Sequence, residues 1–202
     1  MVAHMDHPGF VVEGKDEVRF AGGVEEKYFT GKKIVFYNEQ SRVPLGWARI
    51  KKTAFSDEAK RVILDRAIPK EATFAMWDLP TARCTKKLFI SPACDDLAQV
   101  STVLALLRRL ALSGTRARVE ALFTRAEEIG FAGALAALKA KKKISSITTL
   151  SLETSQARGF ARVDAGPILR VGDRLSVFGS KISHWLDTAF RDRQSARRTS
   201  TS

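Results

Sequence analysis

The segment after residue 87 most constrains the fold, because it alternates between strand-like and helix-like patterns. LFISPACDD reads as a strand that runs into a helix, and apolar spacing continues that helix to Gly114. A strand over residues 117–124, a helix in GFAGALAALKAKKK, a strand in ISSITTLSLET and an amphipathic helix in SKISHWLDTAFRDR follow. Such alternation is typical of α/β sheets. We therefore expect an α/β fold, with a mostly parallel sheet and flanking helices.

Before that segment, short β runs separated by turn residues indicate a different kind of structure. The runs are VRFAGG, KKIVFYN, LGWARIKKTAF, RVILD and ATFAMWD. Several short strands in so little sequence predict a small inserted β-barrel module. We assign residues 14–87 to this module and residues 1–13 and 88–194 to the α/β domain, and we expect a disordered basic tail over residues 195–202.

The composition disfavours several classes of protein. A hydrophobic share of 45% over 202 residues is enough for a core, and no apolar run approaches the roughly 20 residues of a membrane span. The first residues lack a secretory signal pattern, and Cys84 and Cys94 do not make a disulfide framework, so we expect a cytoplasmic protein. The net charge of +12 raises the hypothesis of a nucleic-acid partner. Aromatic residues are not interleaved with the basic ones, so we do not expect that partner.

Acidic residues and a histidine recur where the predicted strands end. They are His4, Asp6, Asp95, Asp96, Glu127, Glu128 and Glu153. Each has an ordinary explanation, because an Asp pair before a helix is usually a cap and adjacent glutamates are usually solvated. Together they are harder to dismiss, since open α/β sheets build their sites at the C-terminal ends of strands.

The chemistry of this set suits a pair of divalent metal ions. His4 and Asp6 share one face of a strand, so His4 could bind a metal while Asp6 orients the imidazole. The carboxylate of Asp95 could bridge two cations. Of Glu127 and Glu128, one could bind metal while the other serves as a general base. Imidazole and carboxylate ligands suit zinc, with cobalt or manganese as alternatives.

Four segments resemble metallopeptidase family 42, the TET-type, deblocking and glutamyl aminopeptidases. AHMDHPGFVV (3–12) resembles the family's AHMDEVGFMV-type motif, and PACDDLAQVSTVLALL (92–107) resembles its DDR-G segment with the following helix. FTRAEEIGFAGALAAL (123–138) resembles its EEVGLRGA segment, and TLSLETS (149–155) stands at its ALDVT-like strand end. The β module at 14–87 resembles the dimerisation or lid domain inserted in the family's catalytic fold.

The resemblance implies a dinuclear-zinc aminopeptidase that removes N-terminal residues from peptides and forms homo-oligomers. It also implies a role for each candidate residue. Metal ligation falls to His4, Glu128 and Glu153, bridging to Asp95, general base catalysis to Glu127, and orientation of the imidazole to Asp6.

The chain also departs from the family pattern. The family has Asp where this chain has Glu153, Arg at the position of Leu97 and Gly at that of Gln99. Relative to the family we expect truncation at both ends, with the final His ligand outside this chain, since His184 on an amphipathic helix does not match it. Two alternatives stay open: a related metal-dependent deacylase or carboxypeptidase, and a catalytically inactive fragment acting as a binding or assembly domain.

Overall fold

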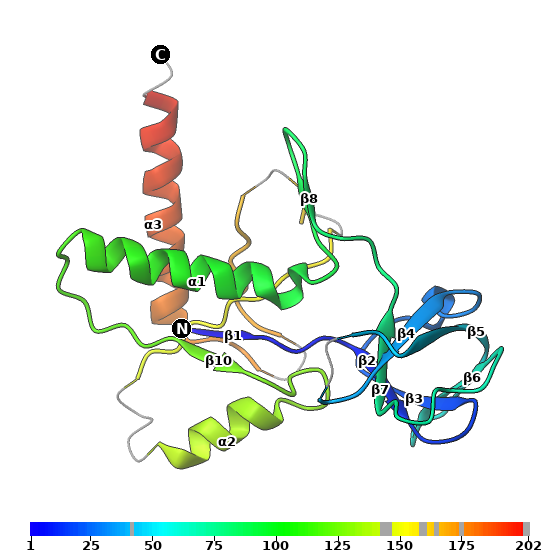
Figure 1. Cartoon of the computed structure of the whole chain (residues 1–202). Helices are drawn as coiled ribbons and strands as arrows, with labels where there is room; N and C mark the ends of the chain where they lie inside the picture. The colour runs from blue at the N-terminus through cyan, green and yellow to red at the C-terminus, as the bar shows by residue number, and fades with distance from the viewer. Residues whose placement is uncertain (41–42, 142–146, 158–160, 164–165, 174–175, 200–202) are drawn as a thin grey trace. The chain divides into compact units, whose positions relative to one another are not determined.

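A closed antiparallel β-barrel makes up most of the first half of the chain (Figure 1). The computed structural model describes all residues except 41–42, 142–146, 158–160, 164–165, 174–175 and 200–202, and the side chains up to residue 192. Around the barrel the strand order is β2-β3-β6-β5-β4-β7. The bounds are β2 (Gly9–Val12), β3 (Glu17–Ala21), β4 (Lys33–Tyr37), β5 (Gly46–Phe55), β6 (Lys60–Leu64) and β7 (Phe74–Trp77). The short 3-10 helix η1 (Glu26–Tyr28) lies between β3 and β4.

Alternation along the barrel strands fills the barrel with apolar side chains. In β3 the buried positions are Val18 and Phe20, and in β4 they are Ile34 and Phe36, with more exposed residues between them. The rings of Phe10 and Trp77 meet edge-on at 4.7 Å between centroids, although they lie on the first and last strands of the barrel in sequence order. Edge-to-face contacts of this kind stabilise a core beyond the area they bury.

A few short parallel segments outside the barrel lead to the residues of the candidate site. Strand β1 (Val2–His4) pairs in parallel with β10 (Leu122–Thr124), in the register His4 to Thr124. On its other side β1 forms a parallel bridge, from Val2 to Ser151. Helix α1 (Cys94–Leu112) packs on β1 and buries Val100 and Val103. The loop after β10 leads into helix α2 (Ala132–Ala140).

The expectation of a mostly parallel sheet with flanking helices is therefore wrong. Most strands of the described residues are antiparallel and belong to the barrel, because consecutive runs joined by short turns pair as hairpins. The strand expected in LFIS is β9 (Phe89–Ile90), which pairs antiparallel with β8 (Arg83–Cys84). The strand expected in ISSITTLSLET is a single bridge at Ser151, and residues 142–146 lie outside the described residues.

The domain boundaries remain a prediction. Strand β2 belongs to the barrel by its pairing with β3 and β7, although residues 9–12 fall in the range that we assigned to the α/β domain. By spatial contacts the chain divides into two units, residues 1–154 and residues 155–202. The second contains helix α3 (Ser180–Thr199), so the backbone is helical over residues 195–199, where we expected disorder. Among the described residues, no helix is both long and apolar enough to cross a membrane.

Candidate metal centre

The candidate site forms where the parallel segments end together. The backbone N–H of Val2 donates to Leu150 O, and that of Leu152 donates to Val2 O, each at 2.9 Å. On the other side, the N–H of Met5 donates to Thr124 O at 2.9 Å. Because the segments are parallel, His4, the loop after Thr124 and the residues after Leu152 reach the same edge.

His4 lies at the centre of this edge. Its side chain is buried, with 3% of the residue exposed. Nδ1 is 3.1 Å from the backbone carbonyl oxygen of Asp6, so an Nδ1–H donated there leaves the lone pair on Nε2. Nε2 faces Asp95 Oδ1 at 3.1 Å, Glu153 Oε1 at 3.7 Å and Glu127 Oε2 at 3.9 Å. A lone pair aimed at carboxylates needs a proton or a metal cation between them.

The start of α1 supplies both aspartates. Asp95 and Asp96 have non-helical backbone angles, and the cap position, Ala93, makes no side-chain cap bond among the described residues. Among the described residues, the hydrogen bonds of these two acids go to His4 and Thr154, and none goes to a backbone N–H in the first turn of α1. Asp96 is fully buried, and its Oδ2 accepts the backbone N–H of His4 at 3.2 Å. The hydroxyl of Thr154 lies 3.4 Å from Asp96 Oδ1 and donates to Cys94 O at 3.0 Å.

The glutamate pair lies on a tight loop between β10 and α2. Ala126 and Phe131 have positive φ angles of 62° and 60°, which are uncommon for residues with a Cβ. Gly133 donates its N–H to Arg125 O at 3.0 Å, and a Cβ there would lie 2.2 Å from that oxygen, so only glycine fits. This turn places Glu127 towards His4 and lets the N–H of Glu128 donate to Asp6 Oδ2 at 3.3 Å.

The charges of the site are unbalanced. Burial, followed by Asp95 and Asp96, raises the pKa of Glu153 to about 7. Burial also raises the pKa values of Glu127 and Glu128, and for Glu128 the neighbouring charge of Glu127 adds to it. Burial alone would lower the pKa of His4, but the surrounding carboxylates, led by that of Glu153, raise it overall. The imidazole of His4 and the carboxylates of Glu127, Glu128 and Glu153 thus have raised pKa values, and a cation bound here would offset the repulsion between the carboxylates.

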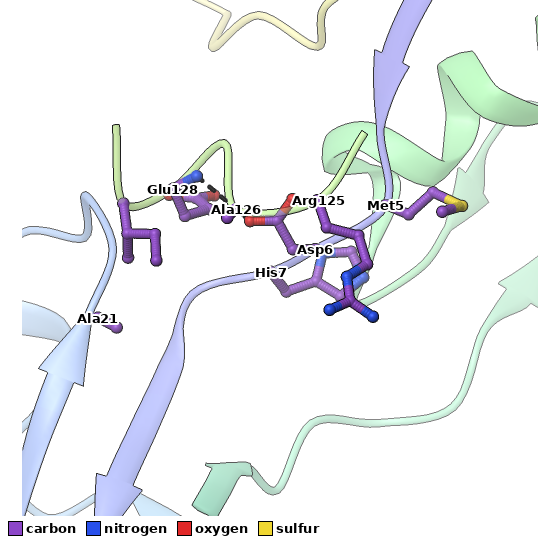
Figure 2. Close-up of a pocket in the computed structure, with 8 residues that line it drawn as sticks. Met5, Asp6, His7, Ala21, Arg125, Ala126 and Glu128 are labelled. Atoms are coloured by element: carbon purple, nitrogen blue, oxygen red, sulfur yellow. Dashed lines mark hydrogen bonds between the residues drawn. The ribbon is translucent and has the colours of Figure 1, made fainter. Parts of the chain in front are cut away.

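An open pocket of about 330 Å³ lies beside Glu128 (Figure 2). The figure shows the hydrogen bond from the Glu128 loop to Asp6 on the segment after β1. Within the described residues, Asp6 Oδ1 is buried without a hydrogen-bond partner, and it lies 3.7 Å from His4 Nδ1. The pocket is lined by Met5, Asp6, His7, Ala21, Arg125, Ala126, Glu128 and Ile129.

A buried imidazole among carboxylates at the ends of parallel strands is typical of metal-dependent hydrolases. A family model described as M42 glutamyl aminopeptidase matches residues 1–194. This chain belongs to that family.

One solved structure, described as "3-D structure of PhTET1-12s, dodecamer in the asymmetric unit", shares the fold. It is 17% identical to this chain in sequence, with a TM-score of 0.72. The match covers 96% of this chain and 64% of that one, so this chain spans less than two thirds of its length. No curated protein matches the sequence.

The structure brings together most of the residues that the sequence singled out. Asp95, Glu127 and Glu153 each have a carboxylate oxygen within 4 Å of His4 Nε2, while Asp6 and Glu128 bind each other. Their individual catalytic roles remain predictions. His184, which we did not match to a ligand, is exposed on α3.

Sequence reasoning missed the part played by Asp96. Donor atoms of His4, Asp96 and Glu153 lie within 4.8 Å of one another, a spacing that would allow all three to hold one ion. The doubled aspartate was the available signal, but the usual role of such a pair as a helix cap hid it. Thr154, whose hydroxyl lies 3.4 Å from Asp96 Oδ1, gave no signal of its own in the sequence.

Replacing Asp96 by asparagine should flatten the pH dependence of stability in the metal-free protein. Burial raises the pKa of Asp96 to about 6 from its ordinary 3.8. The folded chain therefore keeps a proton that the unfolded chain releases, and the wild-type free energy of unfolding falls as pH rises through this window. Relative to Asp96→Asn, we expect a loss of about 2–3 kcal/mol between about pH 4 and pH 7. Urea denaturation with a chelator present measures it, and parallel curves for the two proteins would contradict it.

Proposed function

We propose that this chain is a metal-dependent aminopeptidase-like hydrolase that removes N-terminal residues from peptides. Membership of the M42 family supports peptidase chemistry. The fold that this chain shares with the dodecameric PhTET1-12s structure is compatible with that chemistry. The observation that carries the proposal is the His4 imidazole, whose Nε2 faces carboxylate oxygens of Asp95, Glu127 and Glu153 within 4 Å.

The residues present fit divalent metal ions. One imidazole nitrogen and several carboxylate oxygens form a donor set that suits zinc, and also cobalt or manganese. We assign ligation to His4, Glu128 and Glu153 and bridging to Asp95. Asp96 offers a further oxygen near His4 and Glu153. Carboxylate oxygens of Asp95, Glu127 and Glu153 all lie within 4 Å of His4 Nε2, and we propose that two cations share this set of donors.

The bound ions would polarise the scissile carbonyl and make the attacking water more acidic. Glu127 is the proposed general base, which takes a proton from that water and passes it to the leaving amine. Its side chain is 28% exposed, so it is accessible to water, and its pKa is raised mainly by burial, which makes it a stronger base. The backbone carbonyl of Asp6 holds His4 Nδ1–H and so keeps Nε2 free for ligation.

We further propose homo-oligomers and a cytoplasmic location for this protein. The similar PhTET1-12s structure is a dodecamer, and the inserted barrel is our candidate for the assembly module. We assign the substrate to peptides because of the family, and leave the preferred N-terminal side chain to measurement.

Hydrolysis of aminoacyl p-nitroanilides tests the proposal. We expect activity that is lost with a chelator, returns with zinc, cobalt or manganese, and accompanies binding of about two equivalents of metal in a calorimetric titration. N-acylated amino acids, and N-terminally blocked peptides with a free C-terminus, assayed in parallel, separate an aminopeptidase from a deacylase or a carboxypeptidase. A well-folded preparation that binds no metal would overturn the proposal.

A further inference from the structure

Thr154 directly follows Glu153 and connects it to the start of α1. Its hydroxyl donates to the backbone carbonyl oxygen of Cys94 at 3.0 Å and lies 3.4 Å from Asp96 Oδ1. Cys94 and Asp96 are the residues on either side of Asp95. One hydroxyl therefore links the segment that carries Glu153 to the segment that carries Asp95.

The backbone around Glu153 has little else to hold it in place. The N–H of Leu152 donates to Val2 O at 2.9 Å, and within the described part of the chain no further backbone–backbone hydrogen bond reaches Glu153 or Thr154. The side chain of Glu153 is 38% exposed, so packing does little to fix its direction. The hydroxyl of Thr154 is thus the next attachment after the pairing with β1 ends.

Asp96 extends this link to β1. It is fully buried, and its Oδ2 accepts the backbone N–H of His4 at 3.2 Å. The Thr154 hydroxyl and the Asp96 carboxylate therefore join the three segments that carry His4, Asp95 and Glu153. The spacing that they preserve is 3.1 Å from His4 Nε2 to Asp95 Oδ1 and 3.7 Å from His4 Nε2 to Glu153 Oε1.

We propose that Thr154 is a positioning residue of the metal centre. Its hydroxyl holds the backbone that carries Glu153 against the backbone that carries Asp95, so that the two carboxylates are already spaced when a divalent cation binds. Loss of a group that holds metal ligands in place commonly costs tenfold to a hundredfold in affinity. The inference rests on the proposed function, because it takes Asp95 and Glu153 as metal ligands.

A pair of substitutions at Thr154 tests the inference. Thr154→Val keeps the branched shape and removes the hydroxyl, whereas Thr154→Ser keeps the hydroxyl. Cobalt(II) titrated into the metal-free proteins is the probe, followed by calorimetry and by the visible spectrum of the bound ion. We expect Thr154→Val to weaken cobalt binding by about tenfold and to change the spectrum, with Thr154→Ser within about threefold of wild type and with its spectrum. Equal affinities in the two variants would overturn the inference.

Thr102→Val is the matched control for loss of a threonine hydroxyl. Thr102 is exposed on α1, and its hydroxyl also donates to a backbone carbonyl oxygen, that of Ala98, at 2.9 Å. The control should keep cobalt affinity within about twofold of wild type, as is usual for surface changes. A loss in the control as large as that in Thr154→Val would overturn the inference.

A third variant covers the case in which Thr154→Val does not fold. Thr154→Ala removes the hydroxyl and places no methyl group where the oxygen stood. We expect it to bind cobalt about tenfold more weakly than Thr154→Ser. Thermal denaturation of the metal-free proteins accompanies the titrations. A lower Tm in a variant without the hydroxyl, together with wild-type cobalt affinity and spectrum, would make Thr154 important for folding alone and overturn the inference.

Amide hydrogen exchange in the metal-free protein separates this inference from the proposed function. Without the hydroxyl the end of the segment should open more often, so we expect Thr154→Val to speed exchange at the Leu152 amide by about fivefold. The Met5 amide, which donates to Thr124 O on the other side of β1, should keep its wild-type rate. Unchanged exchange at Leu152 would overturn the inference while the chain still hydrolyses peptides. If the Leu152 amide responds as expected but the wild type binds no cobalt, the proposed function fails, and the positioning role fails with it.

Discussion

Replacing Glu127 by glutamine should lower kcat by between about a hundredfold and ten-thousandfold while metal binding is retained. Glutamine has nearly the same shape but cannot accept a proton from water. Glu127 Oε2 lies 3.9 Å from His4 Nε2, and its side chain is 28% exposed, so the group is close to the proposed metal ions and open to solvent. Steady-state hydrolysis of an aminoacyl p-nitroanilide gives kcat, and calorimetry with cobalt gives the affinity.

Glu120→Gln is the matched control for this substitution. Glu120 is an exposed glutamate that pairs with Lys141, and it is not one of the carboxylates that face His4 Nε2. The control should keep both kcat and cobalt affinity within about twofold of wild type, as is usual for surface changes. A Glu127→Gln protein with wild-type kcat would rule out Glu127 as the general base. Loss of cobalt binding in that variant would instead make Glu127 a ligand.

Replacing His4 by alanine should weaken metal binding by at least about a hundredfold and reduce hydrolysis accordingly. Loss of a group that only orients a ligand commonly weakens metal affinity tenfold to a hundredfold. Because His4→Ala removes a ligand itself, we expect at least the upper end of that range. Buried His4 is placed to share an ion with Asp96 and Glu153, whose donor atoms all lie within 4.8 Å of one another. Calorimetric titration with zinc and with cobalt measures the loss.

His184→Ala controls for the general effect of losing an imidazole. His184 is exposed on α3, in the second unit of the chain, and its removal should leave metal affinity unchanged. Thermal denaturation of His4→Ala and of the milder His4→Gln distinguishes loss of the fold from loss of a ligand. A folded His4 variant with wild-type affinity for both metals would exclude His4 from the site.

The cluster of site residues could be predicted because it depends on short stretches of chain. The parallel pairing of β1 with β10 brings His4 and the loop carrying Glu127 to one edge, as strand–helix–strand patterns predict. Glu153 joins them through the backbone bonds of residues 150 and 152 to Val2. Local periodicity was enough for His4, which is the last residue of β1, and for Glu127, whose loop follows β10.

The contribution of Asp96 could not be predicted in the same way. Its burial depends on non-helical backbone angles at the start of α1. An aspartate pair before a helix does not indicate such angles in the sequence, because the pair usually serves as a cap. The hydrogen bond from the Glu128 N–H to Asp6 Oδ2 depends on tertiary packing between the segment after β1 and the loop after β10. No local pattern in sequence specifies such a contact.

The sequence pattern also could not predict whether most strands pair in parallel or antiparallel. The runs in the barrel and the runs around the site are similar in length and apolar content, so periodicity does not weight one against the other. The structure adds β2 to the barrel and reduces the segment before Glu153 to one bridge. Pairing partners, rather than strand propensity, decided the fold class.

The closed order of the barrel limits how a neighbouring molecule could join it. Because β2 pairs with β7 as well as with β3, the ring of hydrogen bonds is complete, and its described strands offer no free edge. A second copy therefore has no open edge among these strands through which to extend a continuous intermolecular sheet. Any association through this module has to use its outward-facing side chains and its turns, such as the exposed Trp47 on β5. Surface substitutions on the barrel should then change assembly without changing its backbone pairing.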